Sequence, residues 1–185
     1  AKAHCSVLRL KTPRDLVHPR LEYTMMNIGS RFELKPALEN AALKVDSSSS
    51  SKEDLFKEMA DQLHEPTGPE ADEILAALWQ RERFQSTALT GNLALMAANN
   101  PALKATRIGV VTCESPIDFR GPGQREVDCF FVVLSPQKDR QHQLWLLTQI
   151  ARMTLRSDFL PEVRDAKTPE ELRKTLVRAA GNGLL

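Results

Sequence analysis

Residues 86–98 read Ser-Thr-Ala-Leu-Thr-Gly-Asn-Leu-Ala-Leu-Met-Ala-Ala, and this stretch decides how the rest of the chain is organised. It leaves a helical pattern, crosses a loop of small residues and enters an apolar run that is typical of a β-strand. Small residues let a backbone approach a ligand, and the end of a strand can present one side chain to solvent. Met96 and Ala97 occupy that end, and neither is a nucleophile or a base. The stretch therefore predicts a site that has lost its reactive side chain.

The composition indicates one globular domain without a bias toward nucleic acid. The chain has 185 residues, of which 42% are hydrophobic, and 25 basic residues are balanced by 24 acidic ones. This size fits a single domain, and the balanced charge gives no case for a nucleic-acid partner. The apolar runs are too short to cross a bilayer, and no secretory signal opens the sequence. We therefore expect a cytoplasmic location.

The cysteines favour buried free thiols in a reducing compartment. Cys5, Cys113 and Cys129 are odd in number and widely spaced, and the last two lie in apolar runs. No Cys-x-x-Cys pair or clustered His/Cys pattern indicates zinc. We expect no metal and no cofactor.

Residues 1–31 differ from the rest of the chain and are interpreted as an N-terminal extension. Residues 5–10 are typical of one short strand, and prolines and many charges follow. A lone strand cannot satisfy its edges, so the extension should add to a neighbouring sheet or form the tail of a preceding domain. Residues 3–8 also resemble, over a very short match, the last strand of universal-stress-protein domains.

A strand and two helices are predicted before the opening stretch. Residues 41–46 suit a strand with one apolar face, and the serine run 47–51 should end in a helix cap. Both Ser50 and Ser51 precede an acidic residue by three positions, which leaves two capping-box registers open. Pro69 is expected in the first turn of the second helix. The inward-facing residues predicted for these helices are Leu55, Met59, Ala60, Leu63, Ile74, Leu75, Leu78 and Trp79.

Two further strands and three helices are predicted after it. Residues 108–113 and 127–134 are almost continuously apolar, which indicates central strands covered on both faces. Residues 115–119 and 121–123 are expected to form a looped connection between them. The first predicted helix comprises residues 139–156, with Leu144, Leu147, Ala151 and Ile150 inside, and the second comprises residues 157–163. The last predicted helix starts at Thr168-Pro169 and has Glu171 three residues after its cap. Alternating strands and helices indicate an α/β layered domain.

Few residues outside the opening stretch are candidates for chemistry. His142 opens a helix after a strand and a proline-containing loop, where sites are often built, but a solvent-facing helix residue is the plainer interpretation. Asp128 is expected at a polar position of its strand, and Trp79 and Trp145 are expected in the core. Arg81 and Glu82 could form a surface pair.

Several segments together resemble the phosphotransferase-system IIA domain of the fructose/mannitol and nitrogen-regulatory type (EIIA type 2). They match in order from Phe32 to Leu176 and comprise residues 51–55, the Arg81-Glu82 to Ser86-Thr87 step, and residues 115–119, 130–136 and 168–172. The resemblance implies a three-layer α/β/α fold with a central mixed sheet flanked by helices, over residues 32–185.

The family's central motif runs Ser-Thr-Gly, small residues, an apolar strand and then Pro-His. That histidine accepts a phosphoryl group from a phosphocarrier protein and passes it on. Ser86 and Thr87 match the motif, but Met96 replaces the proline and Ala97 replaces the histidine. An alanine methyl has no lone pair and cannot form a phosphoramidate, so the resemblance implies a domain without phosphoryl transfer.

The resemblance also implies a vestigial binding site, made of Thr87, Met96, Ala97, Asn99 and His142. Asn99 stands where a basic residue often follows the motif, and His142 stands where the family has a helix histidine beside its active site. No catalytic residue is expected. A small anion or metabolite is a candidate ligand of the old site.

Three functions remain open. The first is a non-catalytic regulatory domain with a degenerate active site, forming the cytoplasmic part of a membrane transporter at the inner face of the membrane and binding a transmembrane domain or another protein. The second is an active phosphocarrier of the sugar or nitrogen-regulatory branch with an atypical acceptor. The third is a free-standing interaction protein, and a homodimer is an option for any of them. The full-length gene would separate the first from the third.

Overall fold

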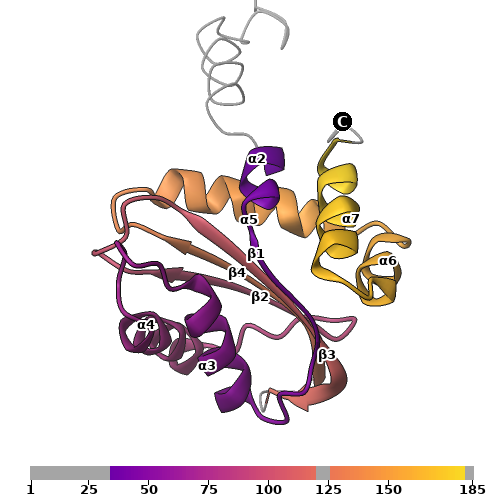
Figure 1. Ribbon diagram of the computed structural model, residues 1–185, viewed down its shortest axis with the longest axis horizontal. Helices are drawn as coiled ribbons and strands as arrows, with labels where there is room; N and C mark the ends of the chain where they lie inside the picture. The colour runs from indigo at the N-terminus through magenta and orange to yellow at the C-terminus, as the bar shows by residue number, and fades with distance from the viewer. Residues whose placement is uncertain (1–33, 120–125, 182–185) are drawn as a thin grey trace, which may run out of the picture. The chain divides into compact units, whose positions relative to one another are not determined.

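The computed structural model describes residues 34–119 and 126–181, and in this part of the chain a mixed sheet lies between two layers of helices (Figure 1). This arrangement confirms the predicted α/β/α fold. The elements are α2 (Leu34–Glu39), β1 (Ala42–Ser47), α3 (Lys52–Leu63), α4 (Ala71–Phe84), β2 (Leu93–Asn99), β3 (Arg107–Asp118), β4 (Glu126–Ser135), α5 (Arg140–Thr154), α6 (Phe159–Asp165) and α7 (Pro169–Gly181).

The sheet has the order β1-β3-β4-β2, so β3 and β4 are central and β1 and β2 form its edges. β3 and β4 are antiparallel, whereas β1 runs parallel to β3 and β2 runs parallel to β4. The central position of β3 and β4 explains their almost continuous apolar sequence, because helices cover both faces of the sheet.

Residues 115–119 were expected to form a loop, and this prediction is wrong for most of them. β3 continues to Asp118, and Ile117 pairs with Val127 of β4. The register shifts between Thr112 and Ile117, and a proline is tolerated in a strand at such an irregular position. Pro116 therefore does not end the strand.

Two apolar clusters fill the space on either side of the sheet. The helices α3 and α4 cover one face, and α2, α5, α6 and α7 cover the other (Figure 1). The predicted apolar stripe of α3, made of Leu55, Met59, Ala60 and Leu63, is buried. Gly109 of β3 lies directly under Met59, and a Cβ atom there would have no room beside the methionine sulfur.

The structure shows where three of the predicted helices begin, and it decides between the two capping registers predicted for α3. Ser51 is the N-cap of α3, and its hydroxyl accepts a hydrogen bond from the Asp54 amide at 3.1 Å. In α4 the N-cap is Glu70, which forms a capping box with Glu73, so Pro69 lies before the helix and not in its first turn as predicted. For α7 the Glu171 amide donates to the Thr168 hydroxyl at 3.2 Å, as the sequence predicted.

The buried face of α5 differs from the predicted one. Leu144 was expected inside, but its exposed fraction is 66%, and the residue that turns inward beside it is Gln143. Gln149 is also buried, together with Leu146, Ile150 and Met153. Two glutamines belong to the inner face of α5. The prediction placed only apolar residues inside, and the predicted inner face is therefore turned about the helix axis relative to the observed one.

Arg173 joins the last described helix to the first one. Its guanidinium on α7 donates to the carbonyl oxygens of Leu38 and Ala41 at 3.3 Å, and also to that of Glu39. These carbonyls lie at the C-terminal end of α2, where they have no partner within the helix. The contact fixes α2 and the start of β1 against α7.

The predictions for residues 1–31, including a strand at residues 5–10, lie outside the described residues, and so does the part of the predicted loop at residues 121–123. Residues 34–119 and 126–181 group into one compact unit by their contacts. Over residues 34–119 and 126–181, no helix has the length and apolar character needed to cross a membrane.

Candidate functional site

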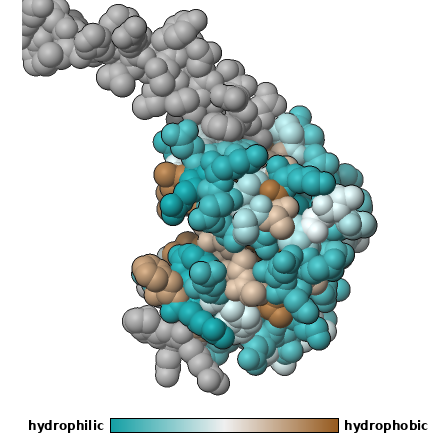
Figure 2. All heavy atoms as spheres, turned by 90° about the vertical axis from the view of Figure 1, so that its left-hand side faces the viewer, coloured by the Kyte–Doolittle hydropathy of each residue, from teal (hydrophilic) through white to brown (hydrophobic). Residues whose placement is uncertain are grey.

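The carboxyl end of β2 borders a hollow of about 330 Å³, which we call the Ala97 hollow. Residues of α4, β2 and the turn after β4 line it: Ala77, Gln80, Arg81, Phe84, Ala97, Ala98, Asn99 and Gln137. Figure 2 views the molecule from the side toward which β2 and β4 run, and small groups of apolar side chains interrupt a largely hydrophilic surface there.

A buried carboxylate fixes the loop that leads into β2. Glu82 of α4 accepts hydrogen bonds from the Thr87 hydroxyl at 2.7 Å and from the Thr87 amide at 3.0 Å. Its other oxygen lies 2.7 Å from the ammonium of Lys52, and the side chains of Lys52 and Glu82 are only 15% and 4% exposed. The suggested surface pair of Arg81 and Glu82 is therefore wrong, because Glu82 points into the protein.

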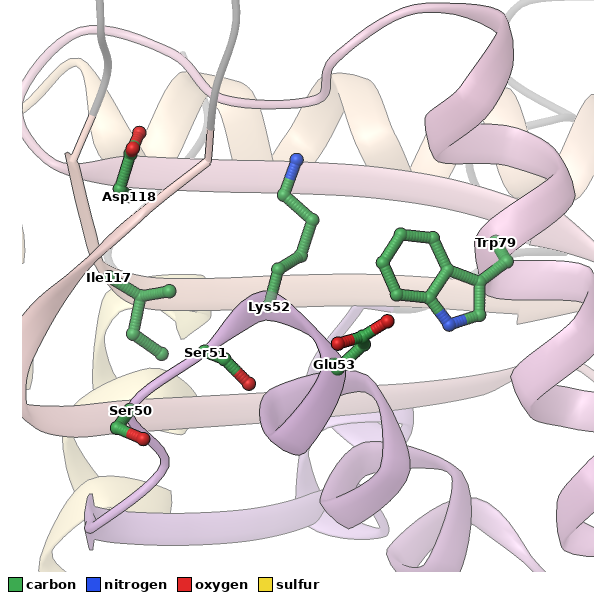
Figure 3. A pocket seen from close by; sticks show the side chains of 7 residues that line it. All are labelled: Ser50, Ser51, Lys52, Glu53, Trp79, Ile117 and Asp118. Atoms are coloured by element: carbon green, nitrogen blue, oxygen red, sulfur yellow. The ribbon is translucent and has the colours of Figure 1, made fainter.

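Lys52 reaches Glu82 from a second hollow, of about 380 Å³, at the start of α3. Figure 3 shows Lys52 rising from the first turn of α3 between Asp118 and Trp79. Its ammonium lies 4.6 Å from the centre of the Phe119 ring and also donates to the Phe119 carbonyl. The charge of Lys52 is thus paired within the protein. Through Glu82, Lys52 supports the loop that leads into β2.

The other end of the loop is held from α6. Gly91 and Asn92 have positive φ angles of 76° and 57°, which bring the chain round into β2. Arg164 donates to the Gly91 carbonyl at 2.6 Å and to the carboxylate of Asp128 at 2.9 Å. The Asn92 carbonyl accepts from the Asp128 amide at 2.9 Å. Asp128 is therefore a polar residue that pairs with an arginine of α6, in line with the polar strand position predicted for it.

Gln143 of α5 holds the carboxyl end of β2 in place. Its amide nitrogen donates to the carbonyl of Ala98 at 2.7 Å and to that of Val133 at 3.0 Å. Its oxygen accepts from the amide of Asn99 at 3.3 Å. Sequence reasoning missed this residue, because a glutamine in an amphipathic helix is ordinarily assigned to solvent.

His142 precedes Gln143 on α5 and is half-buried. Burial lowers the pKa of its imidazole, and the nearby Asp139 carboxylate acts in the opposite direction. The imidazole is therefore neutral at pH 7.

The structure separates the predicted binding residues into two groups. Ala97 and Asn99 line the Ala97 hollow, and His142 adjoins the glutamine that bonds to their strand. Thr87 is buried against Glu82, and Met96 is fully buried in the core on the α3–α4 side. Binding of a ligand by any of them stays a prediction. Sequence reasoning did not place Arg81 or Phe84 at the site, and both line the hollow. The structure draws attention to Phe84, because its exposed fraction is 87% and so exposed a phenylalanine is unusual.

The described residues contain no group of three or more histidine, cysteine or acidic side chains that could hold a metal ion. Cys113 and Cys129 are free, buried thiols, as predicted. Burial raises the pKa of the Cys113 thiol to about 12 and raises that of Cys129 as well. Neither thiol is a nucleophile at neutral pH. The Ala97 hollow itself offers methyl groups, one aromatic ring, amides and the guanidinium of Arg81.

Comparisons with known proteins agree with this fold. Residues 37–179 match the family described as "Phosphoenolpyruvate-dependent sugar phosphotransferase system, EIIA 2". A nitrogen regulatory protein of Bradyrhizobium diazoefficiens is 27% identical over 135 residues, which cover 73% of this chain and 86% of that protein.

Two solved structures show the same fold at lower identity. The nitrogen regulatory protein IIA-Ntr of Neisseria meningitidis has a TM-score of 0.68 and 21% identity, covering 81% of this chain and 99% of that one. The mannitol enzyme IIA of Escherichia coli, in complex with phosphorylated enzyme IIB, has a TM-score of 0.63 and 12% identity, covering 76% and 95%. The present chain belongs to the EIIA type 2 family of the phosphotransferase system.

Proposed function

We propose that this EIIA type 2 domain is a regulatory domain that carries no phosphoryl group and acts by binding a partner at the Ala97 hollow. The observation that carries the proposal is Ala97, which stands at the position of the phosphate-accepting histidine when the family motif is laid on Ser86 and Thr87. The chain has four histidines, and none lies between His64 and His142. No shift of the motif therefore supplies an imidazole at the end of β2.

His142 does not take over the role in this proposal. Phosphoryl transfer between proteins requires a nitrogen in line with the donor, within a site that stabilises the charge of the moving group. His142 lies on α5, an element other than β2 and with its own geometry, whereas Arg81 and Phe84 of the hollow belong to α4.

The direct test offers the protein a phosphoryl group. The full chain is incubated with phosphoenolpyruvate, the general transfer enzyme and the phosphocarrier protein, and its intact mass is measured under neutral conditions. We expect no change in mass. A stoichiometric, acid-labile gain of one phosphoryl group would overturn the proposal and support the phosphocarrier alternative.

A second experiment tests whether the phosphate-accepting histidine is the only part of the family's site that this chain lacks. Ala97→His restores an imidazole at the end of β2, and Met96→Pro with Ala97→His restores the whole family motif. Asn99→His, two positions along the same strand, is the matched control for an added histidine. Labelling of Ala97→His but not of Asn99→His would show that the surface for the carrier survives. Continued absence of labelling would show that this surface has changed as well.

A small anion is the other ligand that the hollow could take, because Arg81 lines it. NMR titrations with phosphate, nucleotides and small carboxylates test this possibility. Shifts confined to Ala97, Asn99 and the Arg81 region would support an anion site. Shifts elsewhere would count against a retained pocket.

The identity of the partner is part of the same proposal. The E. coli mannitol enzyme IIA was solved with a protein partner, which supports a protein as the binding partner here. A membrane transporter that includes this domain at the inner face of the membrane remains the proposed setting. Transmembrane segments encoded in the same reading frame before Ala1 would support it, and a reading frame without them would favour a separate interaction protein.

A further inference from the structure

The outer edge of β2 changes character halfway along the strand. Because β2 is an edge strand, only one of its sides pairs with β4. The loop before it covers the first half of the other side: the Leu89 amide donates to the Leu93 carbonyl at 2.6 Å, and the Leu95 amide donates to the Thr87 carbonyl at 3.2 Å. These bonds show that Leu93 and Leu95 direct their backbone groups outward.

Backbone groups alternate between the two sides of a strand, so Ala97 and Asn99 also direct theirs outward. Within residues 34–119 and 126–181, the outward backbone groups of these two residues pair with no other strand or loop. The second half of β2 therefore presents an open sheet edge, and the same two residues belong to the lining of the Ala97 hollow.

The other edge of the sheet is protected in a way that this one is not. β1 carries Lys44 and Asp46, and charged side chains on an edge strand oppose pairing with another chain. The end of β2 reads Ala-Ala-Asn without a charge. An open, uncharged edge beside a hollow is the arrangement with which proteins add an extended segment of a partner to their sheet.

The charges around the hollow select the chemistry of that segment. Arg81 lines the hollow, and Arg83, Lys138 and Arg140 are exposed on the chain that flanks its lining. Nearby acidic groups offset these charges only in part, because Glu82 is paired with Lys52 and Asp139 is a single half-buried carboxylate between Lys138 and Arg140. In a chain with 25 basic and 24 acidic residues, this surface is locally basic. The exposed ring of Phe84 and the methyl groups of the alanines add an apolar contact.

We propose that an extended, acidic segment of a partner protein with alternating apolar side chains adds to the open end of β2, bonding to the backbone of Ala97 and Asn99. Its carboxylates meet the guanidinium of Arg81, and an apolar side chain enters the hollow beside Phe84. The inference rests on the proposed function, since it specifies how the partner binds at the same hollow.

The test uses the full chain and three synthetic peptides: one alternating Glu and Val, one alternating Lys and Val, and one acidic peptide with proline in place of valine. Binding is followed by backbone amide shifts and by amide exchange. The Glu-Val peptide should slow exchange at Ala97 and Asn99 by about tenfold or more, because an added strand protects outward amides. The lysine and proline peptides should bind at least about tenfold more weakly, since they lack the charge or the backbone donors.

Variants separate the contributions. Arg81→Gln should weaken the Glu-Val peptide about tenfold, as expected for loss of a charge-assisted hydrogen bond. Phe84→Ala should weaken it, whereas Leu155→Ala, which removes another exposed apolar side chain, at 84% exposure, should not. Ala97→Pro removes one outward donor and spares the bonds to β4, so it should abolish the slowed exchange at that edge while circular dichroism reports an intact fold.

Several results would overturn the inference. Equal binding of the lysine peptide would refute the acidic partner, and binding without protection of Ala97 and Asn99 would refute strand addition. Slow exchange of these amides in the free chain would show that the edge is already occupied, by the chain's own residues 1–33 if it is independent of concentration and by a second copy if it is not. Phosphoryl uptake in the labelling test would overturn the proposed function itself. Failure of the Glu-Val peptide without phosphoryl uptake would overturn only the added strand.

Discussion

The two halves of residues 86–99 differ in how they are held. The loop half is fixed from inside the protein, by the Glu82 carboxylate at Thr87 and by Arg164 at Gly91. The strand end is held by Gln143 from one side and is open on the other. The loop thus owes its shape to internal bonds, and none of them involves Ala97. A substitution at position 97 can therefore leave the shape of the loop unchanged.

The largest effect is expected from removing the internal support. Glu82→Ala leaves the mostly buried Lys52 ammonium and the Thr87 donors without their partner, and should lower the free energy of unfolding by about 3–5 kcal/mol. Urea denaturation monitored by circular dichroism measures it. The double variant Lys52→Met with Glu82→Gln keeps an acceptor for Thr87 and removes the buried charge, so it should recover more than half of the loss. A loss below about 1 kcal/mol for Glu82→Ala would contradict the role of the pair as an internal support.

A second comparison lies within α4, which runs from the core to the hollow. Leu78 is fully buried and Phe84 is 87% exposed. Leu78→Ala should destabilise the protein by about 3 kcal/mol, because it leaves a cavity among packed side chains. Phe84→Ala should change the stability by no more than about 0.5 kcal/mol. A large loss for Phe84→Ala in denaturant titrations would mean that Phe84 is covered in solution and is not an exposed contact.

The support of the strand end should be weaker than that of the loop. Gln143→Ala leaves the carbonyls of Ala98 and Val133 without their side-chain donor and should destabilise the protein by about 2 kcal/mol. Gln141→Ala on the exposed side of α5 is the matched control and should be close to neutral. Amide shifts at Ala97 and Asn99 should change only in the first variant. Equal stabilities of the two variants would show that Gln143 does not support the end of β2.

The smallest effect concerns pH. Because burial lowers the pKa of His142, the unfolded chain binds a proton there at a higher pH than the folded chain does. The folded state should lose stability as the pH falls below about 6.5, the usual pKa of histidine. Since the side chain is half-buried and water screens it, the loss should stay below about 1 kcal/mol. His142→Gln should flatten the stability profile between about pH 7 and pH 5. Parallel profiles for the two proteins would show that His142 does not contribute.

The predictions from sequence succeeded where one physical signal dominated. Long apolar runs gave the two central strands, and the cap residues Ser51 and Thr168 gave two helix starts. They failed where a polar group had an internal partner. Gln143 and Glu82 look like surface residues in an amphipathic helix, and their partners Ala98 and Lys52 lie far away in the sequence. Pro116 looked like a strand breaker because the register shift that accommodates it depends on β4.

For the site, the motif located the end of β2 but not its surroundings. Ala97 and Asn99 line the hollow as a strand-end position suggests, whereas Arg81 and Phe84 come to it from α4. Which residues of an edge strand are covered depends on how the preceding loop folds back, and periodicity alone does not give that information. The open half of β2 therefore emerges only from the three-dimensional structure.

The contact of Arg173 with α2 has a consequence for the order of folding. It joins residues as far as 135 positions apart. The bond from Arg173 to the start of β1 can therefore form only after α7 has been synthesised. Contacts of such long range form late, because the loop that they close must be ordered first. A nascent chain that stops before α7 leaves the apolar side of α2 uncovered, together with the start of the edge strand β1. The last helix thus completes the domain, and a chain that still lacks it exposes apolar surface that favours aggregation.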